Sequence, residues 1–308
     1  MWVADRWEDF VLLDAGEGEK LERWGAYVVR RPDPQAIWPR TLAKREWEQV
    51  DAWYHRSASG GGHWEYRKRM PETWEVGYRA LRFNIKLTGF KHTALFPEQA
   101  VNWDWVTERI TRFGTGAQVL NLFAYTGGAT VACAAAGAEV VHLDASKGMT
   151  QMARENIAAS GLGDRKVRYI VDDAVKFVER EIRRGNRYHG IILDPPSFGR
   201  GKSGEVWSIE RDLMPYLARV KLLLHPTPLF FIINAYASGI SRYAIENIIR
   251  VLWDGQPVVI ESNEIGLPVH AREGVCLPAG YTIRMESASG WGDRLRDGAG
   301  SPEAMGKG

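Results

Sequence analysis

The sequence predicts an α/β protein in which a doubly wound, mostly parallel sheet follows a smaller mixed α/β domain. The prediction rests on the chain length, on a regular alternation of strand-like and helix-like segments in the second part, and on an irregular pattern before it. A chain of 308 residues can bury one large core or two ordinary cores, and we expect two. We therefore expect domains at 1–96 and 97–286, followed by a loose tail at 287–308 that is rich in Gly, Ser and charge.

The first domain carries short, irregular apolar runs and many of the 13 tryptophans of the chain. Residues 27–32 (YVVRRP) and 81–90 (LRFNIKLTGF) are predicted strands, and residues 41–55 (TLAKREWEQVDAWYH) are a predicted helix. This combination is typical of a small mixed α/β module.

Basic residues are concentrated in one part of this domain. Residues 30–91 hold 13 Lys/Arg against 7 Asp/Glu, whereas residues 1–29 hold 3 against 7. Phosphate contacts combined with aromatic stacking would make such a segment an RNA-binding or other substrate-binding face, while ordinary mixed surface charge is the alternative. The side chains concerned are Arg30, Arg31, Arg67, Lys68, Arg69, Arg79, Arg82, Lys86 and Lys91, with Trp64, Trp74 and Tyr78.

From residue 97 onward the pattern becomes regular. A helix is predicted from this point because Pro and Glu occupy its first turn and apolar residues then recur at helical spacing. The alternation of strands with helices implies a mostly parallel sheet with helices on both faces and ligands at the carboxyl ends of the strands. The predicted strands are 117–124, 138–145, 167–173, 189–196, 228–235 and 256–262.

The first of these strands runs into a glycine turn, NLFAYTGGAT (121–130). Backbone amides at the start of the following helix suit an anionic group, and Gly127 and Gly128 let a ligand approach the main chain. Phe123 and Tyr125 stand where a GxGxxG motif has its early glycines, so a pyrophosphate is disfavoured. An ordinary strand-to-helix turn is the alternative.

Acidic residues end the next strands. Asp144 follows Gly127 by about 17 residues, which is a position for accepting hydrogen bonds from ribose hydroxyls. Asp172 or Asp173 could accept a hydrogen bond from an adenine amino group. A turn with these acids in register predicts an adenosine-bearing cofactor, and S-adenosylmethionine needs only sites for a ribose, an adenine and an amino-acid end.

The segment IILDPPSFGR (191–200) supplies the candidate catalytic residues, which are Asp194, Pro195, Pro196 and Phe198. Two prolines fix the backbone, so that the Asp194 carboxylate and the Pro195 carbonyl face the cofactor site and can accept hydrogen bonds from a planar N–H group. Phe198 would stack on a base. A rigid loop whose Asp caps the next helix is the alternative. Ser and Gly in the next residues predict a mobile loop at 199–207.

Four segments, NLFAYTGG, VVHLDASKGMTQMARENIAASGL, VDDAVKFV and ILDPPSFGRGKSG, resemble class I S-adenosylmethionine-dependent methyltransferases. They are similar in particular to the bacterial 23S ribosomal RNA large-subunit methyltransferases, over roughly residues 80–286. The resemblance implies a Rossmann-like, seven-stranded sheet and methylation of ribosomal RNA at cytosine C5 or guanine N7. GFKHTALFPEQ (89–99) resembles the linker that closes over the cofactor, with Ala94 and Ala100 where the family usually has glycine and arginine.

Carried over to matching positions, the resemblance implies a set of cofactor contacts on the linker and at the strand ends. They are Thr93, Phe96, Gln99, Asn121, Phe123, Ala124, Tyr125, Thr126, Gly127, Gly128, Asp144, Ala145, Ser146, Asp172, Asp173, Ala174 and Asp194.

The two cysteines bear on the type of methylation. Family members that methylate cytosine C5 use a cysteine just after the fifth strand, where this chain reads FIINAYASG (231–239). Carbon methylation needs covalent attack on the base, so we predict methylation of a base nitrogen in RNA, with a protein or small-molecule acceptor as the alternative. Cys133 and Cys276 lack metal-ligand spacing.

The remaining expectations concern surroundings and partners. No apolar run reaches the length of a membrane span, and the acidic, aromatic start of the chain does not resemble a signal peptide. We expect a cytoplasmic protein that binds RNA, with no metal and no membrane contact. A homo-oligomer remains open.

Overall fold

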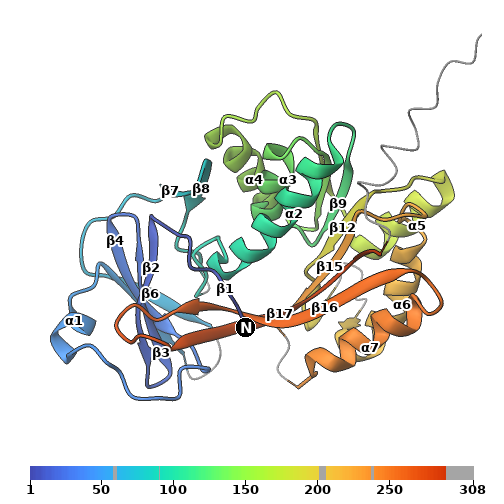
Figure 1. Cartoon of the computed structure of the whole chain (residues 1–308). Helices are drawn as coiled ribbons and strands as arrows, with labels where there is room; N and C mark the ends of the chain where they lie inside the picture. The colour runs from blue at the N-terminus through green and yellow to red at the C-terminus, as the bar shows by residue number, and fades with distance from the viewer. Residues whose placement is uncertain (58–60, 90, 201–205, 237–238, 289–308) are drawn as a thin grey trace, which may run out of the picture.

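The computed structural model describes the chain apart from five gaps, and it contains a small sheet domain beside a larger three-layer α/β body (Figure 1). Within the described residues no helix is long and apolar enough to cross a membrane. The described ranges are 1–57, 61–89, 91–200, 206–236 and 239–288.

The small domain is built on a five-stranded sheet with the order β2-β3-β4-β5-β6. All neighbours in this sheet are antiparallel except β4 and β5, which are parallel. A separate hairpin, β7-β8, follows it. The bounds are β2 Phe10–Gly16, β3 Glu19–Trp24, β4 Tyr27–Pro32, β5 Ala52–Arg56, β6 Gly62–Tyr66, β7 Trp74–Tyr78 and β8 Leu81–Ile85.

The helix predicted over 41–55 is wrong for most of its length. Helix α1 covers only Lys44–Glu48, and the chain then enters β5. The Asp51 carboxylate accepts a hydrogen bond from the backbone N–H of Val28 at 2.7 Å, which ties this point to β4. Residues 52–56 then alternate between buried and more exposed side chains, so sheet pairing overrides the helical spacing. The strand predicted over 81–90 ends at residue 85.

The large sheet has the order β1-β16-β17-β15-β12-β9-β10-β11. Apart from β1, this is the predicted seven-stranded sheet, and only β17 runs antiparallel to its neighbours. The bounds are β1 Trp2–Val3, β9 Gln118–Leu122, β10 Glu139–Asp144, β11 Val167–Val171, β12 Gly190–Leu193, β15 Phe230–Ala235, β16 Val258–Pro268 and β17 Cys276–Ser287.

Helices cover both faces of this sheet, which confirms the doubly wound prediction (Figure 1). Phe230 and Ile232 of β15 pack into one hydrophobic core, while the alternate residues Phe231 and Ile233 pack into the other. Strand side chains point to opposite faces with a period of two, so a strand this apolar must be covered on both sides. The helices are α2 Ala100–Phe113, α3 Gly128–Ala135, α4 Lys147–Ala159, α5 Ala174–Arg184, α6 Ile209–Lys221 and α7 Arg242–Leu252, with a 3-10 turn, η1, at Pro97–Gln99.

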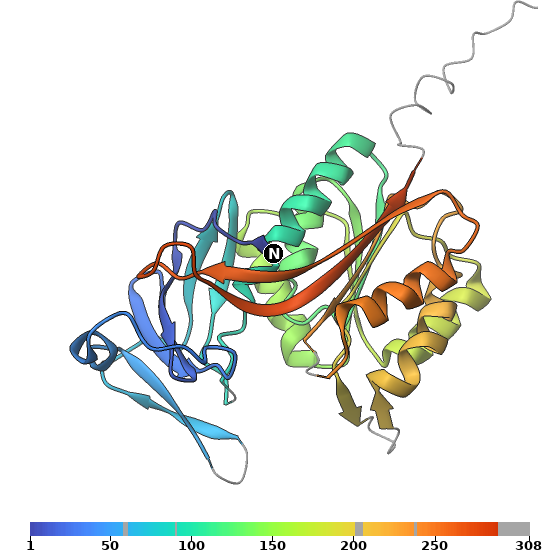
Figure 2. The same ribbon diagram turned by 60° about the horizontal axis from the view of Figure 1, so that its bottom comes forward.

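A long hairpin, β16-β17, joins the two bodies, as Figure 2 shows. Its tip reaches the small domain, where the backbone N–H groups of His270 and Ala271 donate to the carbonyls of Leu12 and Leu13, each at 2.9 Å. In the other direction β1 pairs with β16 of the large sheet. Each body therefore contributes a segment that forms backbone hydrogen bonds with the other. The domain boundary between residues 96 and 97 stays a prediction.

Two predicted loose segments lie mainly outside the described residues. Strands β13 (Phe198–Arg200) and β14 (Val206–Ser208) form an antiparallel hairpin at the ends of the predicted loop. Residues 201–205 of that loop and residues 289–308 of the tail are outside the described part of the chain.

Candidate active site

The turn after β9 has a strained backbone that a carboxylate holds in place. Phe123 and Tyr125 have φ values of 56° and 50°, a left-handed conformation that is rare outside glycine. The Asp144 carboxylate, at the end of β10, accepts hydrogen bonds from the backbone N–H of Tyr125 at 2.9 Å and from that of Ser146 at 2.8 Å. Asp144 therefore shapes the turn, and Ser146 caps α4 through its side chain.

The two glycines of the turn allow protein elements to approach closely. Gly127 caps α3 with φ 82°, and a Cβ there would lie 2.8 Å from the Cβ of Ala153 on α4. A Cβ at Gly128 would lie 2.6 Å from the Trp103 ring. Gly128 also lines the pocket described below, as expected for a residue that a ligand approaches. Gly127 does not line that pocket, and its lack of a side chain instead lets α3 pack closely against α4.

The linker is held against this turn by hydrogen bonds. The Thr126 hydroxyl donates to the carbonyl of Ala94 at 2.6 Å, and Ala94 has a φ of 63°. A left-handed residue at this position explains why glycine is usual there in the family that the linker resembles. Thr93 is buried, and its hydroxyl donates to the carbonyl of Leu95 at 3.3 Å. Thr93 therefore shapes the linker and does not line the pocket.

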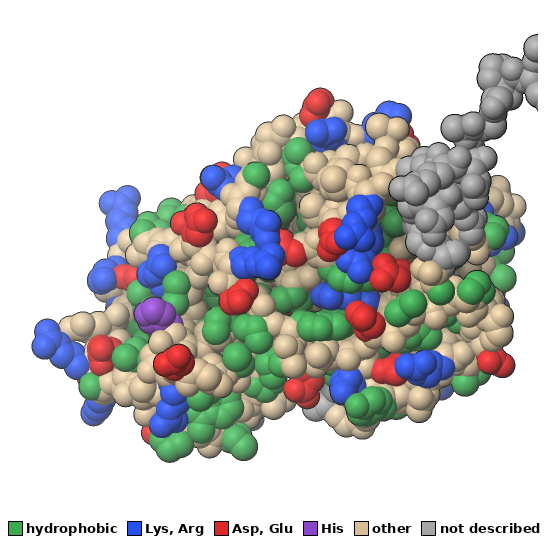
Figure 3. All heavy atoms as spheres, in the orientation of Figure 1, with side chains coloured by type: hydrophobic (Ala, Val, Ile, Leu, Met, Phe, Trp, Pro, Cys, Tyr) green, Lys and Arg blue, Asp and Glu red, His purple; other side chains and the backbone are tan. Residues whose placement is uncertain are grey.

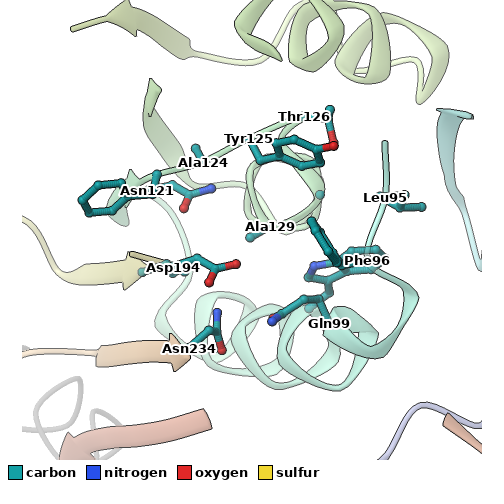
Figure 4. Close-up of a pocket in the computed structure, with 14 residues that line it drawn as sticks. Leu95, Phe96, Gln99, Asn121, Ala124, Tyr125, Thr126, Ala129, Asp194 and Asn234 are labelled. Carbon is teal, nitrogen blue, oxygen red and sulfur yellow. The ribbon is translucent and has the colours of Figure 1, made fainter. Parts of the chain in front are cut away.

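A pocket opens between the linker, the turn and the ends of β12 and β15 (Figure 4). The Phe96 ring packs 5.4 Å from the ring of Tyr125 and 5.6 Å from that of Tyr236, measured between centroids. The predicted residues that line this pocket are Phe96, Gln99, Asn121, Phe123, Ala124, Tyr125, Thr126, Gly128 and Asp194. The lining residues that the prediction missed are Leu95, Trp103, Ala129, Ile192 and Asn234.

A second pocket adjoins the first along the carboxyl ends of the strands, and Phe123 lines both. Asp173 lies in this second pocket and caps α5 by accepting from the backbone N–H of Lys176 at 2.9 Å. Asp172 lies outside both pockets and is paired with Arg180. Of the two acids proposed for adenine, the geometry favours Asp173. Ala145 and Ala174 also line this pocket.

Aromatic residues that the prediction missed form one wall of the second pocket. The Trp207 and Tyr216 ring centroids lie 5.5 Å apart, and each ring is near Phe123. The Tyr216 hydroxyl is buried and has no hydrogen-bond partner within the described residues. Tyr216 sits at ordinary helical spacing in α6, which makes it indistinguishable from a core residue in sequence.

Asp194 stands directly after β12, with its carboxylate facing the first pocket (Figure 4). No donor among the described residues forms a hydrogen bond with this carboxylate. Burial and the nearby Glu98 raise its pKa from 3.8 to about 7. The next helix, α6, has Ser208 at its N-cap position, so the alternative in which Asp194 caps that helix is wrong.

The residues after Asp194 separate into buried and exposed ones. Pro195 is buried and Pro196 is exposed, and the Pro196 carbonyl accepts a hydrogen bond from the Trp207 ring nitrogen at 2.7 Å. Phe198 keeps 58% of its surface exposed, so its ring is available for stacking.

Most of the predicted basic face is neutralised by neighbouring acids. Arg30 and Arg31 are buried in ion pairs with Glu19 and Glu22. On the face that Figure 3 shows, basic and acidic side chains are interspersed, with no single basic patch. Further ion pairs join Arg67 to Glu65, Lys68 to Asp51, Arg79 to Asp104, Arg82 to Glu75 and Lys86 to Glu72.

Neither cysteine lies in the pockets. Cys133 is fully buried in α3, and burial raises the pKa of its thiol. Cys276 opens β17 at the hairpin that reaches the small domain. A buried thiol with a raised pKa is a poor nucleophile, so the described residues offer no cysteine for covalent attack on a base.

The two adjoining pockets together fit the predicted cofactor. They combine the start of α3, the Asp144 turn and Asp173 with a carboxylate at Asp194 that has no hydrogen-bond donor among the described residues. These groups match an anionic carboxylate, a ribose, an adenine and a cationic centre respectively.

Comparison with known proteins gives the same answer. Residues 45–252 match the model of the S-adenosylmethionine-dependent methyltransferase family. A relative from Shewanella frigidimarina, named ribosomal RNA large subunit methyltransferase K/L, is 30% identical over 235 residues. That match covers 73% of this chain and 31% of the relative, so the chain spans about a third of the relative's length.

Solved structures show the same fold. The crystal structure of a methyltransferase from Agrobacterium tumefaciens is 37% identical, covers 91% of each chain and superimposes with a TM-score of 0.86. SMU.776, crystallised with SAH, shares the fold at 19% identity with a TM-score of 0.73, over 92% of this chain and 76% of that one. The chain therefore belongs to the S-adenosylmethionine-dependent methyltransferase family, and it is an enzyme whose cofactor is S-adenosylmethionine.

Proposed function

We propose that the enzyme methylates a nitrogen of a nucleobase in ribosomal RNA, and that Asp194 accepts a hydrogen bond from the proton on that nitrogen. The observation that carries the proposal is the unpaired Asp194 carboxylate, which faces the pocket at the end of β12. The carboxylate is half-buried and accepts no hydrogen bond from the described residues, so an N–H group of the substrate can bind it as solvent leaves the pocket.

The reaction needs an aligned lone pair and a place for one proton. Bound S-adenosylmethionine supplies an electrophilic methyl group. Asp194 and the Pro195 carbonyl would accept hydrogen bonds from the amino group and so direct its lone pair at that methyl. With a pKa of about 7, Asp194 could take the proton that the nitrogen loses once it carries the methyl group.

Three observations favour a base in RNA over a protein or small-molecule acceptor. The exposed Phe198 ring follows Asp194 closely in the chain and can stack on a base. The relative from Shewanella is named for ribosomal RNA. The missing thiol at the site argues for nitrogen rather than carbon. The basic face contributes little, because ion pairs use most of its charge.

Transfer of labelled methyl groups to RNA tests the proposal. Ribosomal RNA lacking its native modifications is incubated with labelled S-adenosylmethionine and either the wild-type enzyme or Asp194→Ala. We expect label in RNA from the wild type and a loss of about 100-fold or more in the variant. Nucleoside analysis then identifies the methylated atom.

A control measurement distinguishes a loss of cofactor binding from a loss of catalysis. Cofactor affinity, measured by calorimetry, shows whether each protein is folded and loaded. Tight cofactor binding without label in any RNA would contradict the proposal and favour the protein or small-molecule acceptor. Label at a carbon atom would contradict the role of Asp194.

A further inference from the structure

A buried network of amide groups orients the side chain of Asn234 toward the first pocket. The network links η1, α2, β15 and β17, and its members are Gln99, Asn102, Asn234, Thr282 and Arg284, each at most 8% exposed. Because an amide can be turned by half a rotation, its direction must be worked out from its partners.

The orientation starts from Arg284, which can only donate. Its guanidinium donates to Asn102 Oδ1 from Nε at 3.0 Å and from Nη2 at 2.7 Å. The oxygen of Asn102 is therefore on the Arg284 side, and its Nδ2 points the other way. From there Nδ2 lies 2.8 Å from Gln99 Oε1, 2.9 Å from Asn234 Oδ1 and 3.0 Å from Thr282 Oγ1.

The direction of Asn102 determines that of Asn234. Asn234 Oδ1 accepts from Asn102 Nδ2 and also from the Thr282 hydroxyl, at 2.7 Å. The Nδ2 group of Asn234 is then left for the pocket, which Asn234 lines. No acceptor for this nitrogen is found within the described parts of the chain, and Figure 4 shows it on the side of Asp194.

Strand register puts Asn234 beside Asp194. Leu193 of β12 pairs with Ile233 of β15, so the residues that follow them are neighbours on adjacent parallel strands, roughly 4.8 Å apart. Strand β15 lies on the far side of β12 from β9, β10 and β11, whose ends form the cofactor groove. Asn234 therefore lies on the side of Asp194 away from those strands, where we place the methyl acceptor.

We propose that Asn234 is a substrate-recognising residue that donates from Nδ2 to an acceptor atom next to the amino group bound by Asp194. The inference rests on the proposed function. Asp194 would accept from an exocyclic amine of the base, and Asn234 Nδ2 would donate to the ring nitrogen next to that amine. Cytosine, adenine and the N2 edge of guanine present this pair of groups. The N7 edge of guanine does not match, because it presents two acceptors.

Asn102 is a positioning residue in this scheme. Changing it to Asp keeps the oxygen that Arg284 binds but removes the N–H groups that donate to Gln99, Asn234 and the Thr282 hydroxyl. Both amides could then rotate, and Asn234 would spend part of its time with its oxygen toward the substrate.

The test is the substitution Asn234→Asp, which keeps the internal acceptor and replaces only the donor. With unmodified 23S ribosomal RNA we expect kcat/KM to fall about 10- to 100-fold, with cofactor affinity unchanged within about threefold. The matched control is Asn247→Asp, the same change on the exposed face of α7, which should leave kcat/KM unchanged.

A double variant separates positioning from general damage. We expect Asn102→Asp to lower kcat/KM by itself but to add nothing to Asn234→Asp, because both act through one donor. Additive losses would show independent damage and overturn the positioning role.

The outcomes also distinguish this inference from the proposed function. If the wild type labels an RNA amine while Asn234→Asp equals it, the inference is overturned and the proposed function stands. A 7-methylguanosine product would likewise overturn it. If the wild type labels no RNA, the proposed function fails and this inference fails with it.

Discussion

Ionisation of Asp194 should make the folded protein less stable as the pH rises. Burial and Glu98 raise the pKa of this carboxyl from 3.8 to about 7. Between about pH 4 and about pH 7 the unfolded chain has lost this proton while the folded chain still holds it, so the contribution of this group to stability falls. Above about pH 7 both states are ionised, and the contribution stays constant.

The magnitude follows from the two pKa values. The full difference corresponds to about 4 kcal/mol, which is an upper limit because solvent still reaches part of the side chain. Asp194→Asn keeps the shape and removes the charge. Its free energy of unfolding, relative to wild type, should therefore increase by up to about 3 kcal/mol between about pH 5 and about pH 8.

Urea unfolding followed by tryptophan fluorescence measures this difference at each pH. The matched control is Asp164→Asn, the same change at an exposed residue. A difference between Asp194→Asn and wild type that stays constant from about pH 5 to about pH 8 would refute the reasoning. It would mean that Asp194 has a charge partner and is not a free acceptor for a substrate.

Two further predictions concern the glycine turn and the cysteines. Gly128→Ala should cost about 1 to 3 kcal/mol of stability, seen as a lower Tm, because the new Cβ would lie 2.6 Å from the Trp103 ring. The control Gly163→Ala meets nothing within 4 Å, and an equal loss there would contradict the packing explanation. The combined Cys133→Ala and Cys276→Ala variant should keep its turnover within about threefold. A loss above about 100-fold in a folded variant would instead indicate covalent catalysis.

Features with a local cause could be predicted. The strands of the large sheet are short apolar runs bounded by turn residues, and Phe230 to Ile233 illustrate why such a strand needs cover on both faces. Asp144 and Asp194 were found because an acid directly after a buried strand must lie at the carboxyl edge of a parallel sheet.

Other predictions failed because long-range contacts overrode the local pattern. The helical spacing over 41–55 gave way to sheet pairing once Asp51 was bound by the backbone of β4. Arg30 and Arg31 resembled surface charge in sequence, yet their partners Glu19 and Glu22 on the adjacent strand bury them.

The sequence by itself determined the fold class, the cofactor and the strand-end acids, because periodicity and turn chemistry depend on residues close together in the chain. Only the tertiary structure decided that no described residue donates a hydrogen bond to the Asp194 carboxylate and that Asn234 turns its nitrogen toward the pocket. The direction of that amide depends on Arg284 and Asn102, which are 182 residues apart in the chain. Such contacts exist only after folding has closed the sheet, so no local pattern encodes them.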